Sequence, residues 1–143
     1  MKRESDAALA KKVFKEYSAF LDANGIRYNN HQGFYVYVDT KNIKHSFTHV
    51  CQPSDGEILI TDYCGNCYTG IRAANRVAKA IQARFPDCDI YPEKYGGAFE
   101  IEIYHTIPFT NIEDLHEHVL RVAKAADEGA GIGYEMLGKS FDR

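Results

Sequence analysis

Apolar residues at the start of the chain recur with the period of a helix. They are spaced three and four residues apart, with lysines and polar residues between them. The apolar positions are Leu9, Val13, Phe14, Tyr17, Phe20 and Leu21. Ser5 can cap the helix, and Asn24-Gly25 favours a left-handed end to it. The pattern predicts an amphipathic helix from about residue 5 to residue 24.

The pattern then changes to alternation of apolar and polar positions, which is typical of half-buried strands. Three short runs show this alternation: residues 34–38, 47–51 and 58–61. Pro53-Ser54-Asp55-Gly56 has strong turn chemistry and separates the second run from the third. We therefore expect these two strands to form a hairpin.

A helical period returns between Thr69 and Phe85. Two further strand-like runs follow, at residues 88–91 and 98–106. Thr110-Asn111-Ile112-Glu113 then has the form of a capping box, which opens a third helix. The predicted order is α-β-β-β-α-β-β-α, an α+β fold with a mainly antiparallel sheet and helices packed on it.

The end of the chain differs from the rest. Residues 129–143 contain four glycines and no sustained period, so we expect a flexible tail there. Residues 1–128 show no linker, and we expect them to form one α+β domain.

Composition narrows the function classes. The chain has 143 residues, of which 45% are hydrophobic, and a net charge of -3. Acidic and basic residues are interspersed, which argues against nucleic acid as a partner. No apolar run approaches the roughly 20 residues of a membrane span, so we expect no membrane contact. The basic N-terminus is not followed by the apolar segment of a signal peptide, so we expect a cytoplasmic location. The composition indicates no cofactor.

Candidate chemistry centres on Cys64-Gly65-Asn66-Cys67, which lies between a strand-like run and a helix-like run. A thiolate at a helix N-terminus is stabilised and becomes nucleophilic, and two thiols at this spacing can exchange a disulfide. Alternatively, the two cysteines are small buried residues at a strand–helix corner. If the pair is a redox site, Cys64 and Cys67 are the attacking and resolving thiols of an oxidoreductase.

A zinc site is the third interpretation of the same cysteines. His49 and Cys51 project from one face of the neighbouring strand, so either side chain is a candidate to join Cys64 and Cys67 as a tetrahedral ligand. By contrast, His116 and His118 lie inside the third helix, where we expect exposed polar residues rather than ligands.

Residues 57–103 partly resemble the selenoprotein-W-like redox proteins. The residues that carry the resemblance are Tyr63 to Tyr68, Arg72-Ala73-Ala74, Phe85-Pro86 and Gly96 to Ile101. The resemblance implies a redox role for Cys64 and Cys67 alone. The chain departs from that family in its N-terminal helix and in the helix that follows Pro108.

A wider resemblance covers residues 5–128. The order of elements, together with Asn75, the run Phe99 to Tyr104, Ile107-Pro108-Phe109 and Ala125-Ala126-Asp127-Glu128, resembles the type III secretion chaperone-like fold and its YbjN-like branch. This resemblance implies a small protein-binding or regulatory domain, often dimeric, with no shared active site.

From these observations we expect a non-enzymatic protein-binding or regulatory domain whose partner is another protein, in the form of a homodimer. Tyrosines on the strands are candidates for the interface, because aromatic residues are enriched there. They are Tyr35, Tyr37, Tyr91, Tyr95 and Tyr104. The alternative is the thiol–disulfide oxidoreductase. Glu100 and Glu102 lie on the same face of their strand, and we expect this face to be solvated because both residues are charged.

Overall fold

The computed structural model of the chain describes residues 2–43 and 45–137, except for the side chains of residues 2–5, 45 and 66. Within these residues the chain forms three helices: α1 (Lys2–Ala23), α2 (Ile71–Arg84) and α3 (Ile112–Leu137). It also forms six strands: β1 (Tyr28–Asn29), β2 (Phe34–Asp39), β3 (His45–Val50), β4 (Glu57–Tyr68), β5 (Asp89–Tyr95) and β6 (Ala98–Pro108).

All six strands belong to one antiparallel sheet in the order β1-β2-β3-β4-β6-β5. The α+β prediction is confirmed, and so is the order of the longer elements. The short strand β1 is an addition. It contains only two residues and pairs with the middle of β2, so it is too short to produce a periodic signal in the sequence.

The hairpin predicted between the second and third strands is β3–β4. Ser54 pairs with Glu57, and the turn between them uses positive φ angles at Asp55 and Gly56. These angles explain the turn sequence, because glycine and aspartate tolerate the left-handed region. β4 is much longer than the sequence predicts, since it continues through both cysteines to Tyr68.

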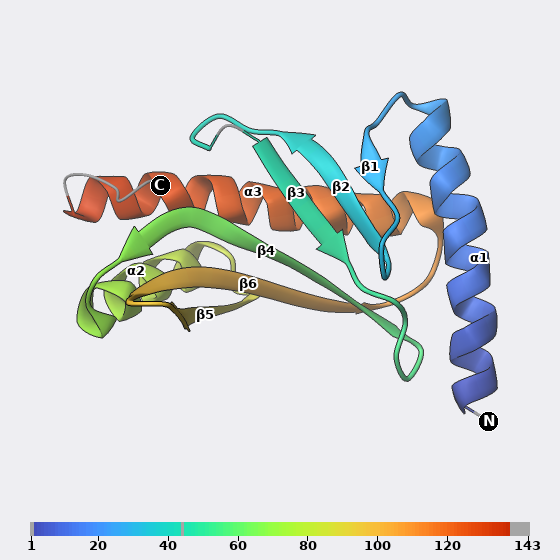
Figure 1. The fold of residues 1–143 in the computed structure, drawn as a ribbon, viewed down its shortest axis with the longest axis horizontal. Coiled ribbons are helices and arrows are strands. Elements are labelled where there is room, and N and C mark those ends of the chain that lie inside the picture. Colours follow the sequence, from blue (N-terminus) through green and yellow to red (C-terminus); the bar gives the residue numbers. More distant parts are fainter. Residues whose placement is uncertain (1, 44, 138–143) are drawn as a thin grey trace.

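The two faces of the sheet differ in whether helices of the described residues cover them. Inward positions on the central strands are buried against α2 and α3 and form the core, with Tyr17 and Leu21 of α1 at one end. In Figure 1, α3 runs behind β2 and β3, and α1 stands at the right-hand end of the sheet. The outward positions alternate with the buried ones and are covered by no helix in the described part of the chain.

The third helix continues well beyond its predicted end, and the expected tail is wrong for residues 129–137. These residues are the last turns of α3, and Gly129, Ala130 and Gly133 are buried. Small side chains at these positions allow the helix to lie close to β4: a Cβ atom on Gly129 would lie 2.6 Å from Cys64 Sγ. The glycines conceal the helical period because they bury backbone rather than large side chains. The remaining tail positions, 138–143, lie outside the described residues.

The start of α3 is capped one residue later than predicted. The Asn111 side chain accepts a hydrogen bond from the Asp114 backbone N–H at 2.8 Å, and Thr110 donates to the Asp114 carboxylate at 2.9 Å. Asn111 is therefore the N-cap, and Asp114 takes the position in the capping box that was predicted for Glu113.

Asp127 fastens the β2–β3 hairpin to α3. Its carboxylate accepts hydrogen bonds from three consecutive backbone N–H groups, those of Lys41, Asn42 and Ile43, at 3.1, 2.6 and 3.0 Å. The Asn42 side chain returns a bond to the Asp127 carbonyl at 3.0 Å. A buried carboxylate thus satisfies the donors of a tight loop, which otherwise lacks sheet partners.

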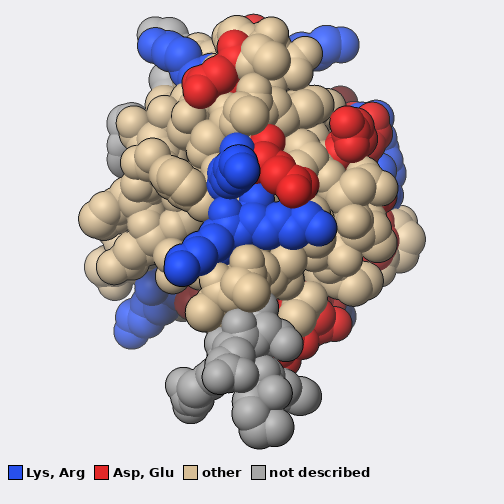
Figure 2. All heavy atoms as spheres, turned by 90° about the vertical axis from the view of Figure 1, so that its right-hand side faces the viewer, with Lys and Arg blue, Asp and Glu red and all other residues tan. Residues whose placement is uncertain are grey.

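The outer surface of α1 carries mixed charge. Lys11, Lys12, Lys15 and Glu16 are exposed there, while Val13 and Tyr17 point inward. Seen from this end, lysine and arginine side chains form a band across the middle of the molecule with acidic side chains beside it (Figure 2). No helix in the described residues combines the length and apolar character needed to cross a bilayer.

Candidate functional site

Both cysteines of the Cys-x-x-Cys pair lie inside β4 rather than at the start of a helix. The register of β4 against β6 shifts between Tyr63 and Cys67, and Gly65 has a φ of 89°. The pair therefore sits in a bulge of the strand, and α2 begins only at Ile71. The placement at a strand–helix junction was wrong, because β4 persists through the bulge.

This placement removes the helix-terminus effect that the redox hypothesis required. Cys64 is fully buried, and burial raises the pKa of its thiol well above the ordinary value, with a further rise from the charge of Asp62. Cys67 is half-buried, and its Sγ lies 3.8 Å from Glu100 Oε2, to which it donates. The four cysteines form no disulfide with one another. Cys64 has the properties of a core residue rather than of an attacking nucleophile.

The four candidate zinc ligands are not brought together. The Cys51 backbone N–H bonds to Leu59 O at 2.8 Å, so Cys51 lies opposite Leu59 on β4. Cys64 is further along β4 by five residues, which is about 17 Å at the usual rise of a strand. The four residues cannot share one zinc ion, because β4 starts beside Cys51 and runs away from it before it reaches Cys64.

His49 and Cys51 make a contact of their own. Cys51 Sγ lies 3.7 Å from His49 Nδ1, and His49 Nε2 lies 3.2 Å from Gln32 O. The second contact requires a proton on Nε2, so Nδ1 accepts from the thiol. The imidazole also stacks on Tyr35 with ring centroids 4.2 Å apart. Burial raises the Cys51 pKa, which keeps the thiol protonated.

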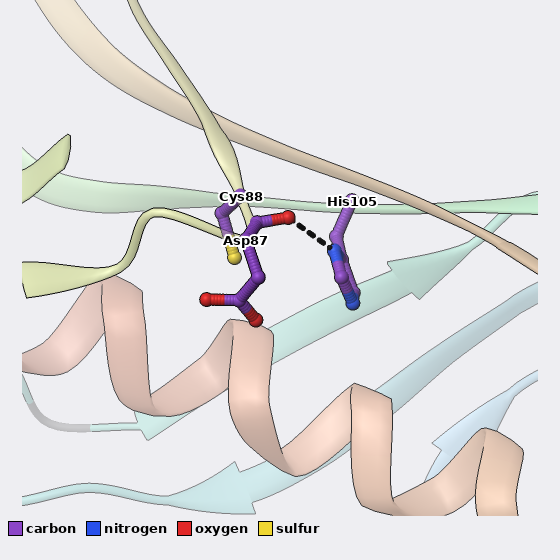
Figure 3. Close-up of side chains that lie close together, drawn as sticks. All are labelled: Asp87, Cys88 and His105. Atoms are coloured by element: carbon purple, nitrogen blue, oxygen red, sulfur yellow. Dashed lines mark hydrogen bonds between the residues drawn. The ribbon is translucent and has the colours of Figure 1, made fainter.

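A second polar cluster, which was not predicted from the sequence, joins the sheet to α3. Asp87, Cys88 and His105 place their potential ligand atoms within 4.8 Å of one another (Figure 3). His105 Nδ1 donates to Asp87 O at 3.0 Å, and His105 Nε2 lies 2.8 Å from His118 Nδ1. His118 is thus half-buried and paired, and not a simple exposed residue.

The contacts of this cluster do not suit a metal ion. Both ring nitrogens of His105 are engaged, and Arg121 binds both oxygens of Asp87 at 2.8 and 3.1 Å. Burial raises the pKa of Cys88 to about 11, so its thiol holds its proton. A metal would have to displace a bidentate ion pair and sit beside a guanidinium charge. We interpret the cluster as a polar link between α3 and the sheet.

Asp62 occupies an inward position on β4. Its carboxylate accepts hydrogen bonds from Ser46, from Thr48 at 3.0 Å and from the Tyr63 backbone N–H at 2.8 Å. Burial raises the pKa of Asp62 to about 6, although these bonds favour the charged form. The group is enclosed beneath the helices, where an external substrate has no contact with it.

The outward face of the sheet carries the exposed aromatic residues of the strands. Phe47, Tyr63 and Tyr91 are 43%, 47% and 49% exposed. Aromatic pairs fix several of the rings, including Tyr37 on Phe47 and Tyr91 on Tyr104, both edge-to-face. We refer to the outward side of β2 to β6 as the open face. Its aromatic content is the feature of the surface best suited to binding.

Charge is unevenly distributed over the open face. On the β4–β6–β5 half, Glu93, Glu100 and Glu102 point outward, because they share the alternation of Tyr91 and Tyr63 across the paired strands. On the β2–β3 half, Arg27 lies over the Tyr37 ring, with its guanidinium carbon 4.2 Å from the ring centroid. One half is therefore acidic and the other carries a cation.

Comparison with known proteins gives a structural neighbour. The crystal structure of YbjN from E. coli, described as a candidate transcription regulator, superposes with a TM-score of 0.61 over 91% of this chain and 94% of that one, at 12% sequence identity. The chain has the YbjN fold. No protein-family model matches the sequence, and no curated protein matches it.

The YbjN likeness confirms the resemblance expected from the order of elements, at the level of the fold. At this identity it assigns no residue a role. The regulatory description belongs to YbjN itself.

Sequence reasoning missed Asp62, His105 and Asp127. Asp62 and His105 do carry a signal, because each falls at an inward position between buried apolar residues of its strand. A polar residue at such a position needs a partner in the fold. Asp127 carries no comparable signal, since its partners in the hairpin are more than eighty residues away.

Proposed function

We propose that this chain is a non-enzymatic binding domain whose open face binds another protein. The observation that carries the proposal is the exposure of Phe47, Tyr63 and Tyr91 on the one sheet face that no described helix covers. Aromatic residues on a rigid sheet supply large contact area at low entropic cost, and they are enriched at protein interfaces. A catalytic role lacks comparable support, because Cys64 is enclosed and His105 is engaged at both nitrogens.

A second copy of the chain is the alternative occupant of the same face, as the expected homodimer would require. Sedimentation equilibrium over a wide range of protein concentration distinguishes the two. A stable dimer that dissociates when Tyr91 is changed to glutamate would assign the open face to self-association. If the chain is a monomer at all concentrations, the open face is available to a different protein.

Site-specific crosslinking tests the proposal in the cells that produce the protein. A photo-crosslinking amino acid replaces Phe47 on the open face or, as a control, the exposed Lys79 on α2. We expect a discrete partner band from position 47 and none from position 79. The Tyr63→Glu substitution in the position-47 protein should abolish that band. Equal crosslinking from both positions, or no band from position 47, would contradict the proposal.

A further inference from the structure

One in-register row of the open face has a carboxylate between two tyrosines. Glu102 on β6 pairs with Tyr63 of β4 on one side and with Tyr91 of β5 on the other. Only 9% of Glu102 is exposed, and its charge acts on the neighbouring hydroxyls of Tyr63 and Tyr104. The carboxylate therefore has aromatic residues on both sides.

The next outward row adds two like charges. Glu93 and Glu100 lie directly opposite each other on β5 and β6. Such pairs destabilise a sheet. No lysine or arginine side chain in the described part of the chain forms an ion pair with Glu93, Glu100 or Glu102. Three carboxylates on two neighbouring rows thus lie on the outward side of the strands, and no cation among the described side chains is paired with them. We call these three residues, with Tyr63, Tyr91 and Tyr104, the acidic tyrosine patch.

The negative charge of the patch helps to raise the pKa values of two of its tyrosines. The Tyr63 pKa is raised to about 12, by partial burial first and then by the charge of Glu102 and its hydrogen bond, with Glu100 adding to it. The Tyr104 pKa is raised in the same way, by burial and by Glu102. Both hydroxyls therefore remain neutral. Neutral aromatic rings beside fixed carboxylates form a surface complementary to an organic cation.

We propose that the acidic tyrosine patch binds an arginine side chain presented by a partner protein. A guanidinium group bonds a carboxylate through two parallel N–H groups and stacks on an aromatic ring, whereas an ammonium group is a strongly hydrated point charge. The same open face already holds one such pair, Arg27 on Tyr37. The patch also disfavours acidic partners, because three carboxylates repel them.

This inference rests on the proposed function, and it names the chemistry of the partner segment. The test uses the full isotope-labelled chain and three acetylated pentapeptides, Gly-Arg-Gly-Arg-Gly and its lysine and glutamate counterparts. Binding is followed by amide chemical shifts at low salt. We expect shifts confined to β4, β5 and β6, weaker binding of the lysine peptide, and no binding of the glutamate peptide. Raising the salt should weaken the arginine complex.

Two matched variants decide the role of the carboxylates. The double change Glu93→Gln and Glu100→Gln should weaken binding of the arginine peptide about tenfold, since it removes two ion pairs. It should also raise the Tm by about 1–4 °C, because it removes a cross-strand repulsion. Loss of binding with gain of stability excludes misfolding as the cause. Glu16→Gln on α1 removes one carboxylate away from the patch and should leave binding unchanged.

The outcomes separate this inference from the proposed function. If the double glutamine variant binds the arginine peptide as tightly as Glu16→Gln does, or the shifts lie outside the patch, arginine recognition is wrong. A partner crosslinked at position 47 that the arginine peptide does not displace would keep the open face as a binding surface while removing this inference. Equal crosslinks at positions 47 and 79 would instead remove the proposed function.

Discussion

Asp62 is a carboxyl group that the fold encloses among hydroxyl groups rather than cations. Ser46 and Thr48 on β3 and one backbone N–H supply its described hydrogen bonds. Hydroxyls hydrogen-bond to either protonation state, so they do not outweigh the loss of hydration. The native state therefore holds the Asp62 proton to higher pH than the unfolded chain does.

The Asp62→Asn substitution tests this charge directly. Because the pKa rises from 3.8 to about 6 on folding, the unfolded chain loses this proton first as the pH rises. The contribution of Asp62 to stability is thus complete below about pH 4 and is lost as the pH rises through about 6. We expect Asp62→Asn to raise the free energy of unfolding at pH 7.5 by up to about 3 kcal/mol. Urea unfolding measures it, with Asp22→Asn, at an exposed position, as the control.

The burial of Cys64 should protect its thiol from alkylation in the folded chain. Its sulfur is enclosed and its thiol pKa is raised by burial, so iodoacetamide should modify it only when the chain unfolds. Half-buried Cys67 should react earlier, and mass spectrometry of digested peptides distinguishes the two sites. Fast native modification of Cys64 would restore the oxidoreductase hypothesis that the structure disfavours.

The β2–β3 hairpin depends on a single side chain of α3. Replacing Asp127 by alanine leaves the N–H groups of Lys41, Asn42 and Ile43 without their acceptor. We expect a loss of about 2–4 kcal/mol in the free energy of unfolding and faster amide exchange at these three residues. Glu128→Ala, next along the helix, removes only exposed pairs with Arg84 and Lys124 and should cost less than about 1 kcal/mol.

The elements that the sequence predicted are those with large, periodic apolar side chains. The two boundaries that were misplaced most, the ends of β4 and α3, lack such side chains. β4 continues through Cys64 and Cys67, where polar residues and a bulge interrupt the alternation. α3 continues past Gly129, where the fully buried positions are glycine and alanine. The error in β4 also produced the error about the thiols, because it moved them to a helix start that lies further along the chain.

The response of the whole molecule to pH combines groups of opposite sign. Burial lowers the pKa of His105, with help from the charge of His118, and burial also lowers the pKa of His116. Their contribution is present above the unfolded value of 6.5 and is lost as the pH falls through the lower folded values. Asp62 acts in the other direction. Between pH 7 and 5 the two effects oppose each other in the wild-type chain.

Thermal unfolding of the wild type and of Asp62→Asn between pH 7 and 5 separates the effect of Asp62 on stability from that of the histidines. We expect the variant to lose stability more steeply on acidification, because only the histidine contribution remains. Parallel curves for the two proteins would mean that Asp62 is already ionised in the folded state well below pH 6. Circular dichroism suffices as the readout.

Alternation along β6 was enough to predict that Glu100 and Glu102 share one face of the sheet, but the prediction of a solvated face is wrong for Glu102, which is only 9% exposed. Glu100 and Glu102 do share the open face with Tyr91 and Tyr104. The sequence did not predict the row Tyr63–Glu102–Tyr91, because β4 is the neighbour of β6 only through a long-range pairing. For the same reason the link between His105 and His118 followed from no local pattern.

The missing side chain at Gly129 restricts the order in which this sequence can change. Alanine normally favours a helix over glycine by about 1 kcal/mol. Here its Cβ would lie 2.6 Å from Cys64 Sγ and 2.9 Å from Ile81 Cδ1, and the crowding outweighs that gain. If Cys64 first becomes alanine, the space it leaves can accept the new methyl group. The two positions thus form an epistatic pair, open to substitution in one order and closed in the other.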